Sequence, residues 1–261
     1  MSTRKLYDAT SAYQRIYVGQ RGDLRFMRFG DYHAGWQGAV YVKHPHRLYF
    51  GYQQAFSLFS IVRSDVSRFL SVGVGTGTAI SHVHHFYPRA KLVGIELDPD
   101  VLSVAKSCFF MPMDERVQLV TEDARTCVPK LADAFDLIFV DVFFHERTPA
   151  ALLSPIYLRV LSDILMDGGV AVFNVIMSYG GSDREVFGRL CTDLKALIGP
   201  VFYIPLGMVP YLSQNIVVFA CKDARLLSEA TLKRNAVRYI EEHQMVYGFK
   251  AKRLPYLLKV W

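Results

Sequence analysis

The chain has 261 residues, 51% of them hydrophobic and 21% charged, which favours a sizeable folded core and excludes intrinsic disorder. No apolar run reaches the roughly 18 residues of a membrane span, and the first residues are polar, so we expect a cytoplasmic protein without a membrane partner. The net charge of +6 comes from scattered Lys and Arg, and the four cysteines form no Cys-x-x-Cys pair, so neither a nucleic-acid partner nor a metal site is expected.

Residues 1–46 have the composition of a small β-subdomain. Tyr13–Val18 and Leu24–Phe29 are strand-like and are separated by Gly19–Asp23, a turn signal, so we expect a β-hairpin here. From Arg47 to Ile61, aromatic and aliphatic residues recur at helical spacing. This pattern predicts a helix that leads into the main domain.

Residues 47–223 are predicted to form an α/β domain, and residues 224–261 a C-terminal helix, over Ala224–Glu242, followed by a tail. Strand-like and helical patterns alternate in the first part of the α/β domain. This alternation predicts a doubly wound, mostly parallel seven-stranded sheet. The last strand is expected to be antiparallel, because residues 206–215 are too few for a helical crossover. The seven expected strands are Phe69–Val72, Lys91–Glu96, Val117–Thr121, Leu137–Asp141, Gly169–Val175, Val201–Pro205 and Ile216–Cys221.

A glycine-rich stretch follows the first of these strands. Gly73, Gly75 and Gly77 stand at alternate positions before a helical pattern, so backbone N–H groups can approach a ligand near a helix N-terminus. Glu96, at the end of the second strand, follows Gly73 by 23 residues, which is close to the spacing of an acid that binds ribose hydroxyls. Together these residues predict a nucleoside site.

Two further acids end the third and fourth strands and are expected at the same edge of the sheet. Asp123 can accept a hydrogen bond from an adenine amine, cap the following helix, or do both. Asp141 can hold or deprotonate an ammonium group, or be a structural acid at the strand end. Asp98, just before Pro99, is expected to cap the helix after the second strand.

At these residues the chain resembles the class I S-adenosylmethionine-dependent transferases, and within them the spermidine synthase-like polyamine aminopropyltransferases. The narrower resemblance also uses the N-terminal half and the loop before the last strand. The segments that carry it are Tyr13-Gln14-Arg15-Ile16, Phe50-Gly51-Tyr52-Gln53 and Val209-Pro210-Tyr211-Leu212-Ser213-Gln214.

The resemblance implies a role for each matching residue. Gln14 and Gln53 would contact the nucleoside donor, beside the loop of Gly73, Gly75, Thr76 and Gly77. Glu96 would bind the ribose and Asp123 the adenine of that donor. Asp141 would hold the donor or act as the base on an amine acceptor, and Tyr52 and Tyr211 would line the acceptor site. A homodimer is also compatible with the family.

Two departures from the family pattern leave the reaction open. Thr76 stands where the family has an Asp that binds the ammonium of decarboxylated S-adenosylmethionine, and Phe144 stands where it has an acid that holds the polyamine. Aminopropyl transfer from the decarboxylated donor is the first hypothesis. Methyl or other alkyl transfer from S-adenosylmethionine to a less cationic small molecule is the second, and a catalytically silent nucleoside-binding or scaffold protein is the third.

Several other residues are weaker candidates. His82, His84 and His85 follow the glycine loop and are expected on the surface, while His44, His46 and His145 are candidate general bases. The segment Tyr179–Ser182 is either a plain loop or a lid over the site.

Overall fold

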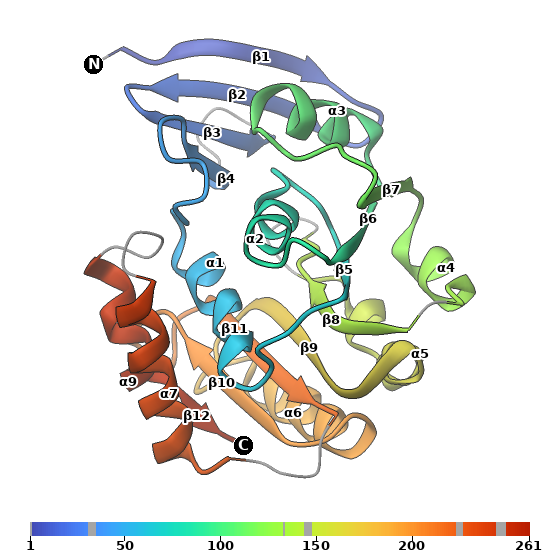
Figure 1. Cartoon of the computed structure of the whole chain (residues 1–261), viewed down its shortest axis with the longest axis vertical. Helices are drawn as coiled ribbons and strands as arrows, with labels where there is room; N and C mark the ends of the chain where they lie inside the picture. The colour runs from blue at the N-terminus through green and yellow to red at the C-terminus, as the bar shows by residue number, and fades with distance from the viewer. Residues whose placement is uncertain (1, 31–34, 133, 144–147, 223–226, 244–248) are drawn as a thin grey trace.

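The computed structural model describes residues 2–30, 35–132, 134–143, 148–222, 227–243 and 249–261. These residues form a four-stranded antiparallel sheet at the N-terminus and a larger eight-stranded sheet with helices on both faces (Figure 1). The predicted α/β fold with an N-terminal β-subdomain is therefore confirmed. The division into three segments at residues 46 and 223 stays a prediction.

The N-terminal sheet contains the predicted hairpin and two more strands. The hairpin pairs Ile16 with Phe29 and turns at Gly22. The sequence did not predict the first strand, because most of its side chains are exposed and it has no alternating apolar pattern. In spatial order the strands are β1 (Arg4–Thr10), β2 (Arg15–Arg21), β3 (Leu24–Phe29) and β4 (Trp36–Tyr41).

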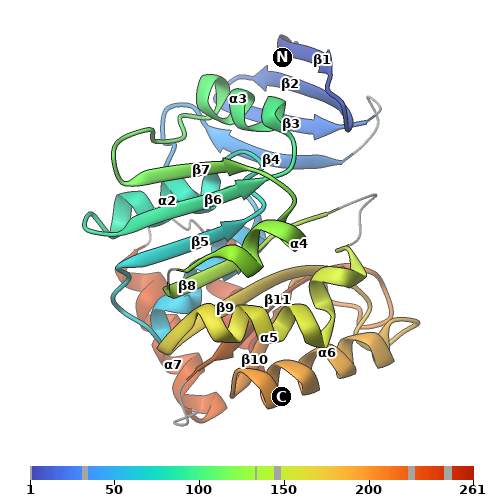
Figure 2. The ribbon, with the colours of Figure 1, turned by 90° about the vertical axis from the view of Figure 1, so that its right-hand side faces the viewer.

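Helix α3 (Pro99–Cys108) joins this sheet to the main domain (Figure 2). Ile16 and Met27 of the sheet pack with Val101 and Val104 of the helix in one buried cluster. The contact fixes the N-terminal sheet beside the carboxyl ends of the main strands, where the site lies.

The main sheet has the strand order β12-β10-β11-β9-β8-β5-β6-β7. The five strands from β9 to β7 are parallel, and β11 is antiparallel between β9 and β10, as predicted. The eighth strand, β12 (Lys259–Val260), pairs with β10 at the edge and is too short for a sequence pattern. The other strands are β5 (Arg68–Val72), β6 (Lys91–Glu96), β7 (Val117–Thr121), β8 (Phe135–Val140), β9 (Leu165–Met177), β10 (Val201–Pro205) and β11 (Gln214–Cys221).

Two groups of helices cover the two faces of the sheet with apolar side chains. One face carries α1 (Gly51–Phe56), α2 (Thr78–Phe86), α3 and α7 (Glu229–Glu242), and the other carries α4 (Ala124–Cys127), α5 (Pro155–Ile164) and α6 (Arg184–Leu197). Short helices η1 (Ser57–Ile61), η2 (Val128–Lys130), η3 (Ala150–Leu153), η4 (Phe249–Arg253) and α9 (Leu254–Leu257) complete the fold.

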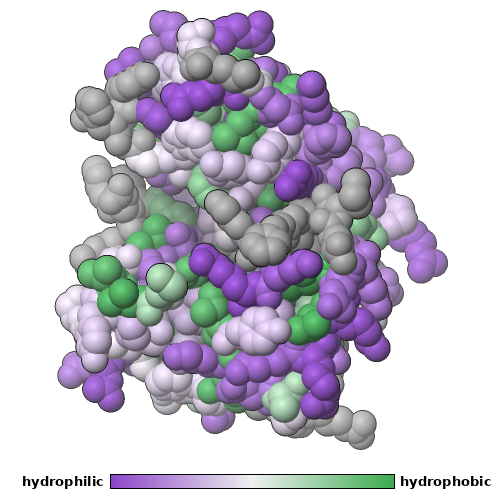
Figure 3. All heavy atoms as spheres, turned by 90° about the vertical axis from the view of Figure 1, so that its left-hand side faces the viewer, coloured by the Kyte–Doolittle hydropathy of each residue, from purple (hydrophilic) through white to green (hydrophobic). Residues whose placement is uncertain are grey.

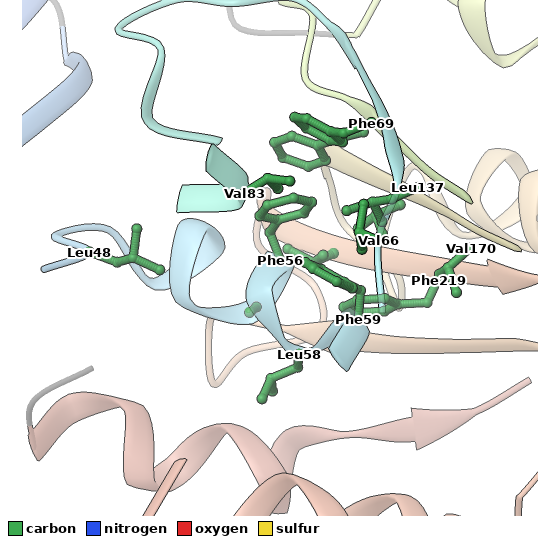
Figure 4. Close-up of a cluster of buried hydrophobic side chains, with 14 of the residues drawn as sticks. Leu48, Phe56, Leu58, Phe59, Val66, Phe69, Val83, Leu137, Val170 and Phe219 are labelled. Atoms are coloured by element: carbon green, nitrogen blue, oxygen red, sulfur yellow. The ribbon is translucent and has the colours of Figure 1, made fainter. Parts of the chain in front are cut away.

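Helix α1 is shorter than the sequence predicted, because the chain becomes helical only at Gly51 and not at Arg47. Its apolar side chains reach the middle of the sheet: Phe56 lies against Phe69 and Val83, and Phe59 follows in η1 (Figure 4). This packing anchors α1 on the sheet and leaves its N-terminal turn at the carboxyl ends of the strands.

The predicted C-terminal helix is confirmed from Glu229 to Glu242. It begins later than predicted, because Ser228 is its N-cap and Leu227 is not helical, and residues 224–226 lie outside the described part of the chain. None of the helices in the described ranges combines the length and the hydrophobicity that a membrane span requires.

Candidate active site

A cavity of about 700 Å³ lies at the carboxyl ends of the central parallel strands. The strand order reverses beside β5, and this is where open α/β sheets bind ligands. The cavity is walled by the glycine loop, the N-terminal turn of α1 and residues of the N-terminal sheet. The molecular surface is hollowed between the N-terminal sheet at the top and the lower part of the main domain (Figure 3). The volume suits a small-molecule site.

The glycine loop brings two of its three glycines to the cavity, Gly73 and Gly75. Gly73 has a φ of 86°, and a Cβ there would overlap the backbone oxygen of Asp141 on the neighbouring strand end. Gly77 is instead the N-cap of α2, with a φ of 73°, and a Cβ there would lie 2.6 Å from the Met111 sulfur. Gly77 therefore shapes the turn and does not line the cavity.

Glu96 lines the cavity and holds the glycine loop in place. One carboxylate oxygen accepts hydrogen bonds from the backbone N–H groups of Val74, at 3.0 Å, and Gly75, at 3.1 Å. The other accepts from the Leu97 N–H at 3.0 Å. The carboxylate thus faces both the loop and the cavity, and its contact with a ribose stays a prediction.

Asp123 and Asp98 both line the cavity and cap helices, as the sequence indicated. Asp98 accepts from the Asp100 N–H at 3.0 Å and from the Ser11 hydroxyl at 2.5 Å, which ties the N-terminal strands to α3. Asp123 caps α4 and pairs with the Arg125 guanidinium at 2.5 Å, which lowers the pKa of its carboxyl group. Asp123 therefore carries a negative charge at neutral pH, and its contact with an adenine stays a prediction.

Asp141 follows β8 and lies on the cavity wall. Its carboxylate ends a row of hydrogen bonds that runs through the side-chain amides of two asparagines. The Asn174 amide donates to its carboxylate at 2.8 Å, and the Asn215 amide donates to the Asn174 oxygen at 3.1 Å. Burial raises the pKa of Asp141 to about 7; the Glu96 charge acts in the same direction and the Asn174 hydrogen bond in the opposite one. At neutral pH this carboxyl group can therefore both accept and release a proton.

The sequence reading missed Asn174 and Asn215, although one signal was visible. Asn174 is a polar residue within the otherwise apolar run of β9, near the carboxyl end of the strand. A buried amide at such a position usually has a specific hydrogen-bond partner. Its partner, Asp141, could be identified only once the strand order was known.

Tyr52 and Gln53 enter the cavity from the first turn of α1. Gln53 is only 5% exposed; its side-chain oxygen accepts from the Phe50 N–H at 3.2 Å and its amide lies 3.4 Å from the Tyr52 hydroxyl. Burial, and then the Asp141 charge, raise the pKa of Tyr52 well above its usual value, so its hydroxyl stays protonated. Gln14 lines the cavity from the start of the N-terminal hairpin.

Thr76 is 5% exposed and lies between the cavity and strand β4. Its hydroxyl is 3.0 Å from the Thr78 hydroxyl, and a Cβ on Gly38 of β4 would overlap its side chain. The N-terminal sheet therefore closes directly over Thr76.

Some predicted site residues do not line the cavity. Tyr211 is 73% exposed, and the Gly180 N–H donates to the Pro210 oxygen at 2.9 Å, so the segment Tyr179–Ser182 packs on the Tyr211 loop. The exposed His44 and His46 are also absent from the cavity wall, and the His46 ring stacks on His85. Phe144 and His145 lie outside the described residues.

The prediction that the three histidines of α2 lie on the surface is wrong for His82. His82 is 2% exposed, lines the cavity and has a ring centroid 4.8 Å from that of Phe86. Burial lowers its pKa to about 3. His84 is partly buried and pairs with Asp114 at 2.7 Å, and His85 is exposed. Helix periodicity alone could not tell which histidine faces Phe56 rather than water.

Among the described residues there is no group of three or more His, Cys, Asp or Glu that could hold a metal ion. The polar groups of the cavity instead suit an organic ligand. The described part of the cavity wall carries carboxylates, among them Glu96, Asp123 and Asp141, together with the glycine loop, aromatic side chains and His82.

Comparison with known proteins agrees with this arrangement. A curated polyamine aminopropyltransferase from Neisseria meningitidis is 21% identical over 257 residues, which cover 95% of this chain and 94% of the relative. A probable spermidine synthase from Corynebacterium glutamicum superimposes with a TM-score of 0.76 at 19% identity, covering 88% of this chain and 86% of the other.

Two further solved structures share the fold. One is a spermidine synthase in complex with the transition-state analogue AdoDATO, with a TM-score of 0.70, 16% identity and coverage of 97% of this chain and 85% of the other. The second is human methyltransferase-like protein 13 in complex with SAH, with a TM-score of 0.59, 20% identity and coverage of 74% and 89%. The class I methyltransferase-like fold is thus confirmed.

The family model described as the spermine/spermidine synthase domain matches residues 51–233, which is more than half of the chain and contains the glycine loop, Glu96, Asp123 and Asp141. The chain therefore belongs to the spermine/spermidine synthase family of transferases, as its motifs predicted.

Proposed function

We propose that this protein transfers the aminopropyl group of decarboxylated S-adenosylmethionine to the amine of a small molecule. Membership in the spermine/spermidine synthase family supports this reaction. So do the curated relatives that are polyamine aminopropyltransferases and the solved relative in complex with AdoDATO.

The observation that carries the proposal is the position of Asp141. Its carboxyl group has a pKa of about 7 and shares the cavity wall with Glu96, whose charge acts on it, and with Tyr52, on whose hydroxyl its own charge acts. An acceptor amine must be deprotonated before it can attack, and a base with a pKa near the working pH is best suited to take that proton.

The reaction then needs little more than correct placement. The neutral amine nitrogen attacks the donor methylene next to the sulfonium; a C–N bond forms, the C–S bond breaks and its electron pair leaves on the sulfur of methylthioadenosine. The amine proton moves to Asp141. The sulfonium is already a good leaving group, so holding the two reactants in line provides much of the acceleration. Negative charge on Asp141 also favours a cationic donor.

The remaining cavity residues fit the donor in this proposal. Glu96 would accept from the ribose hydroxyls and Asp123 from the adenine amine, while Gln14 and Gln53 would contact the nucleoside from the N-terminal side. Because Gly73 and Gly75 have no side chain, the donor could approach their backbone closely. All six side chains or backbones line one cavity, which is the property that a single bound donor requires.

Thr76 favours a second candidate, methyl transfer from S-adenosylmethionine. A carboxylate at this position would attract the donor ammonium and repel the carboxylate of the full donor, whereas the buried Thr76 hydroxyl can donate a hydrogen bond to a carboxylate. The structural likeness to methyltransferase-like protein 13 is compatible with that reaction. Asp141 would serve as the base in both reactions.

One experiment separates the candidates. The protein is incubated with a mixture of amines and either donor, and the nucleoside product is identified by mass spectrometry. Methylthioadenosine indicates aminopropyl transfer, and S-adenosylhomocysteine indicates methyl transfer. Asp141→Asn should lower kcat/KM by about a hundredfold or more, in line with the loss of a general base, while Asp163→Asn, on the exposed side of α5, should not.

The outcomes that contradict the proposal are equally clear. Calorimetric binding of methylthioadenosine without turnover of either donor would favour a silent nucleoside-binding protein. No binding of any adenosyl ligand would refute both enzymatic candidates.

A further inference from the structure

Asn174 connects the candidate base Asp141 to a second asparagine, Asn215, whose side chain the proposed reaction does not use. Asn174 is 1% exposed and stands in the chain between Phe173 and Val175, which are fully buried. A buried side-chain amide in such surroundings needs partners for both its oxygen and its NH2 group. Asp141 and Asn215 are those two partners.

The main sheet brings these three residues together from separate strands. β11 pairs with β9 in a register that places Asn215 diagonally across from Asn174. Diagonal neighbours on one face of a sheet are within reach of long side chains. On the other edge of β9, β8 pairs with Val140 opposite Phe173, so that Asp141 follows beside Asn174. All three residues line the cavity.

The hydrogen bonds between these side chains all run in one direction. The Asn215 amide donates to the Asn174 oxygen at 3.1 Å, and the Asn174 amide donates to the Asp141 carboxylate at 2.8 Å. A side-chain amide has an oxygen on one side and an NH2 group on the other, so each side of Asn174 suits a different kind of partner. Because Asn215 occupies the Asn174 oxygen, the NH2 group of Asn174 faces Asp141.

This direction favours one protonation state of Asp141. An ionised carboxylate only accepts hydrogen bonds and matches the NH2 group, whereas a protonated carboxyl group also donates and would match the Asn174 oxygen. Since Asn215 occupies that oxygen, the protonated form gains less from Asn174 than the ionised form does. Donation by Asn215 also polarises the Asn174 amide and strengthens its hydrogen bond to the carboxylate.

The Asn174 hydrogen bond opposes the effects that keep Asp141 protonated. Burial, and to a smaller extent the Glu96 charge, raise the pKa of Asp141, and the Asn174 hydrogen bond lowers it. Among the described residues, the other titratable groups that interact with Asp141 are Glu96, at the end of β6, and Tyr52, on α1. Tyr52 stays protonated and adds no charge.

We propose that Asn215 is a positioning residue, which holds the NH2 group of Asn174 toward Asp141 and thereby favours the ionised carboxylate that takes the proton of the acceptor amine. This inference rests on the proposed function, in which Asp141 is the base. Asn215 acts through Asn174 and needs no contact with the donor or the acceptor.

The test measures the pKa of Asp141 in the full-length protein without ligand. The carboxyl carbons of aspartate are isotopically labelled and followed by NMR as the pH is changed, and the Asp141 signal is identified by its absence from Asp141→Asn. Asn215→Leu removes the donor and should raise this pKa by about half a unit to one unit, the size expected for one hydrogen bond between neutral groups. Asn215→Val, which suits a strand, should shift the pKa in the same direction.

A double-mutant cycle shows whether Asn215 acts through Asn174. Asn174→Leu should raise the pKa of Asp141, and adding Asn215→Leu should raise it no further. Gln214→Leu is the matched control, because Gln214 precedes Asn215 on β11 and its amide bonds to the loop at Gly207 instead. It should leave the pKa of Asp141 unchanged. Ionisable residues outside the described ranges are the same in all of these proteins and do not affect the comparison.

Activity gives a second readout that a purely structural role would not produce. With the donor that the protein consumes, Asn215→Leu should move the acidic limb of the kcat/KM profile to higher pH by the same amount as the NMR titration. kcat/KM should therefore fall about three- to tenfold well below pH 7 and stay the same at about pH 9.

Three results would overturn the inference. They are a pKa of Asp141 that Asn215→Leu leaves unchanged or lowers, a shift in the double variant that equals the sum of the single shifts, and a loss of kcat/KM that is the same at every pH. The NMR titration needs no turnover. If the pKa shifts as expected while neither donor is consumed, only the proposed function has failed. If a donor is consumed while the pKa does not respond, only the role of Asn215 has failed.

Discussion

Replacing Asp141 with Asn should change how the free energy of unfolding depends on pH. The pKa of this carboxyl group rises from 3.8 to about 7 on folding, mainly because burial disfavours its charged form. Between pH 3.8 and about pH 7, the folded state binds the Asp141 proton more tightly than the unfolded state does. The contribution of the neutral carboxyl group to the free energy of unfolding is therefore complete below pH 4 and is lost as the pH rises toward 7. Asp141→Asn removes this dependence, because the amide stays neutral at every pH.

The size of the effect follows from the shift. About three pKa units at 1.36 kcal/mol each give roughly 4 kcal/mol, as an order of magnitude, and water in the cavity reduces this figure. Urea unfolding of both proteins at pH 4, 5, 6, 7 and 8 measures the difference. Relative to wild type, the variant should gain stability up to pH 7 and then level off.

A matched carboxylate gives the control. Glu122 also lines the cavity, but hydrogen bonds from Lys130 and Thr126 lower the pKa of its carboxyl group. Glu122→Gln should therefore produce the opposite trend. Its free energy of unfolding should fall relative to wild type as the pH rises from 3 to 5. If the difference in the free energy of unfolding between wild type and Asp141→Asn stays constant from pH 4 to 8, the reasoning about Asp141 is refuted.

Four further changes have defined outcomes. Asn174→Leu removes the hydrogen bond to Asp141 and should move the acidic limb of the pH–rate profile up by about one unit; an unmoved limb would exclude Asp141 as the titrating base. Glu96→Ala should weaken calorimetric binding of methylthioadenosine about tenfold or more, and unchanged affinity would remove Glu96 from the site. Thr76→Asp should raise kcat/KM with the decarboxylated donor relative to the full donor, and the reverse would contradict the charge argument. Gly38→Ala should lower the free energy of unfolding by about 1–3 kcal/mol in urea titrations, and adding Thr76→Ala should recover most of it if their contact is the cause.

The sequence could predict features that depend on neighbours along the chain or on repeated spacing. The alternation of strands and helices, the antiparallel last strand and the order of glycine loop and Glu96 all follow from local patterns, and the structure confirms the fold that they predicted. The helix caps at Asp98 and Asp123 are equally local, since each side chain bonds an N–H group two residues away.

Side chains that face each other across the fold could not be predicted in this way. Strand β1 and strand β12 are set by their partner strands and carry too little pattern of their own. Tyr211 has the expected motif but lies on an exposed loop away from the cavity wall, because the packing of that loop on residues 178–182 decides where it points.

The sequence by itself determined the fold, the family and the strand-end acids, because each rests on residue type and spacing. Only the tertiary structure decided the protonation of Asp141, its link to Asn174, and the burial of Thr76 and His82. Those properties depend on how much water and which charges surround a side chain. The residues that surround each of these side chains come from strands and helices that are distant in the sequence. These elements become neighbours only when the chain folds.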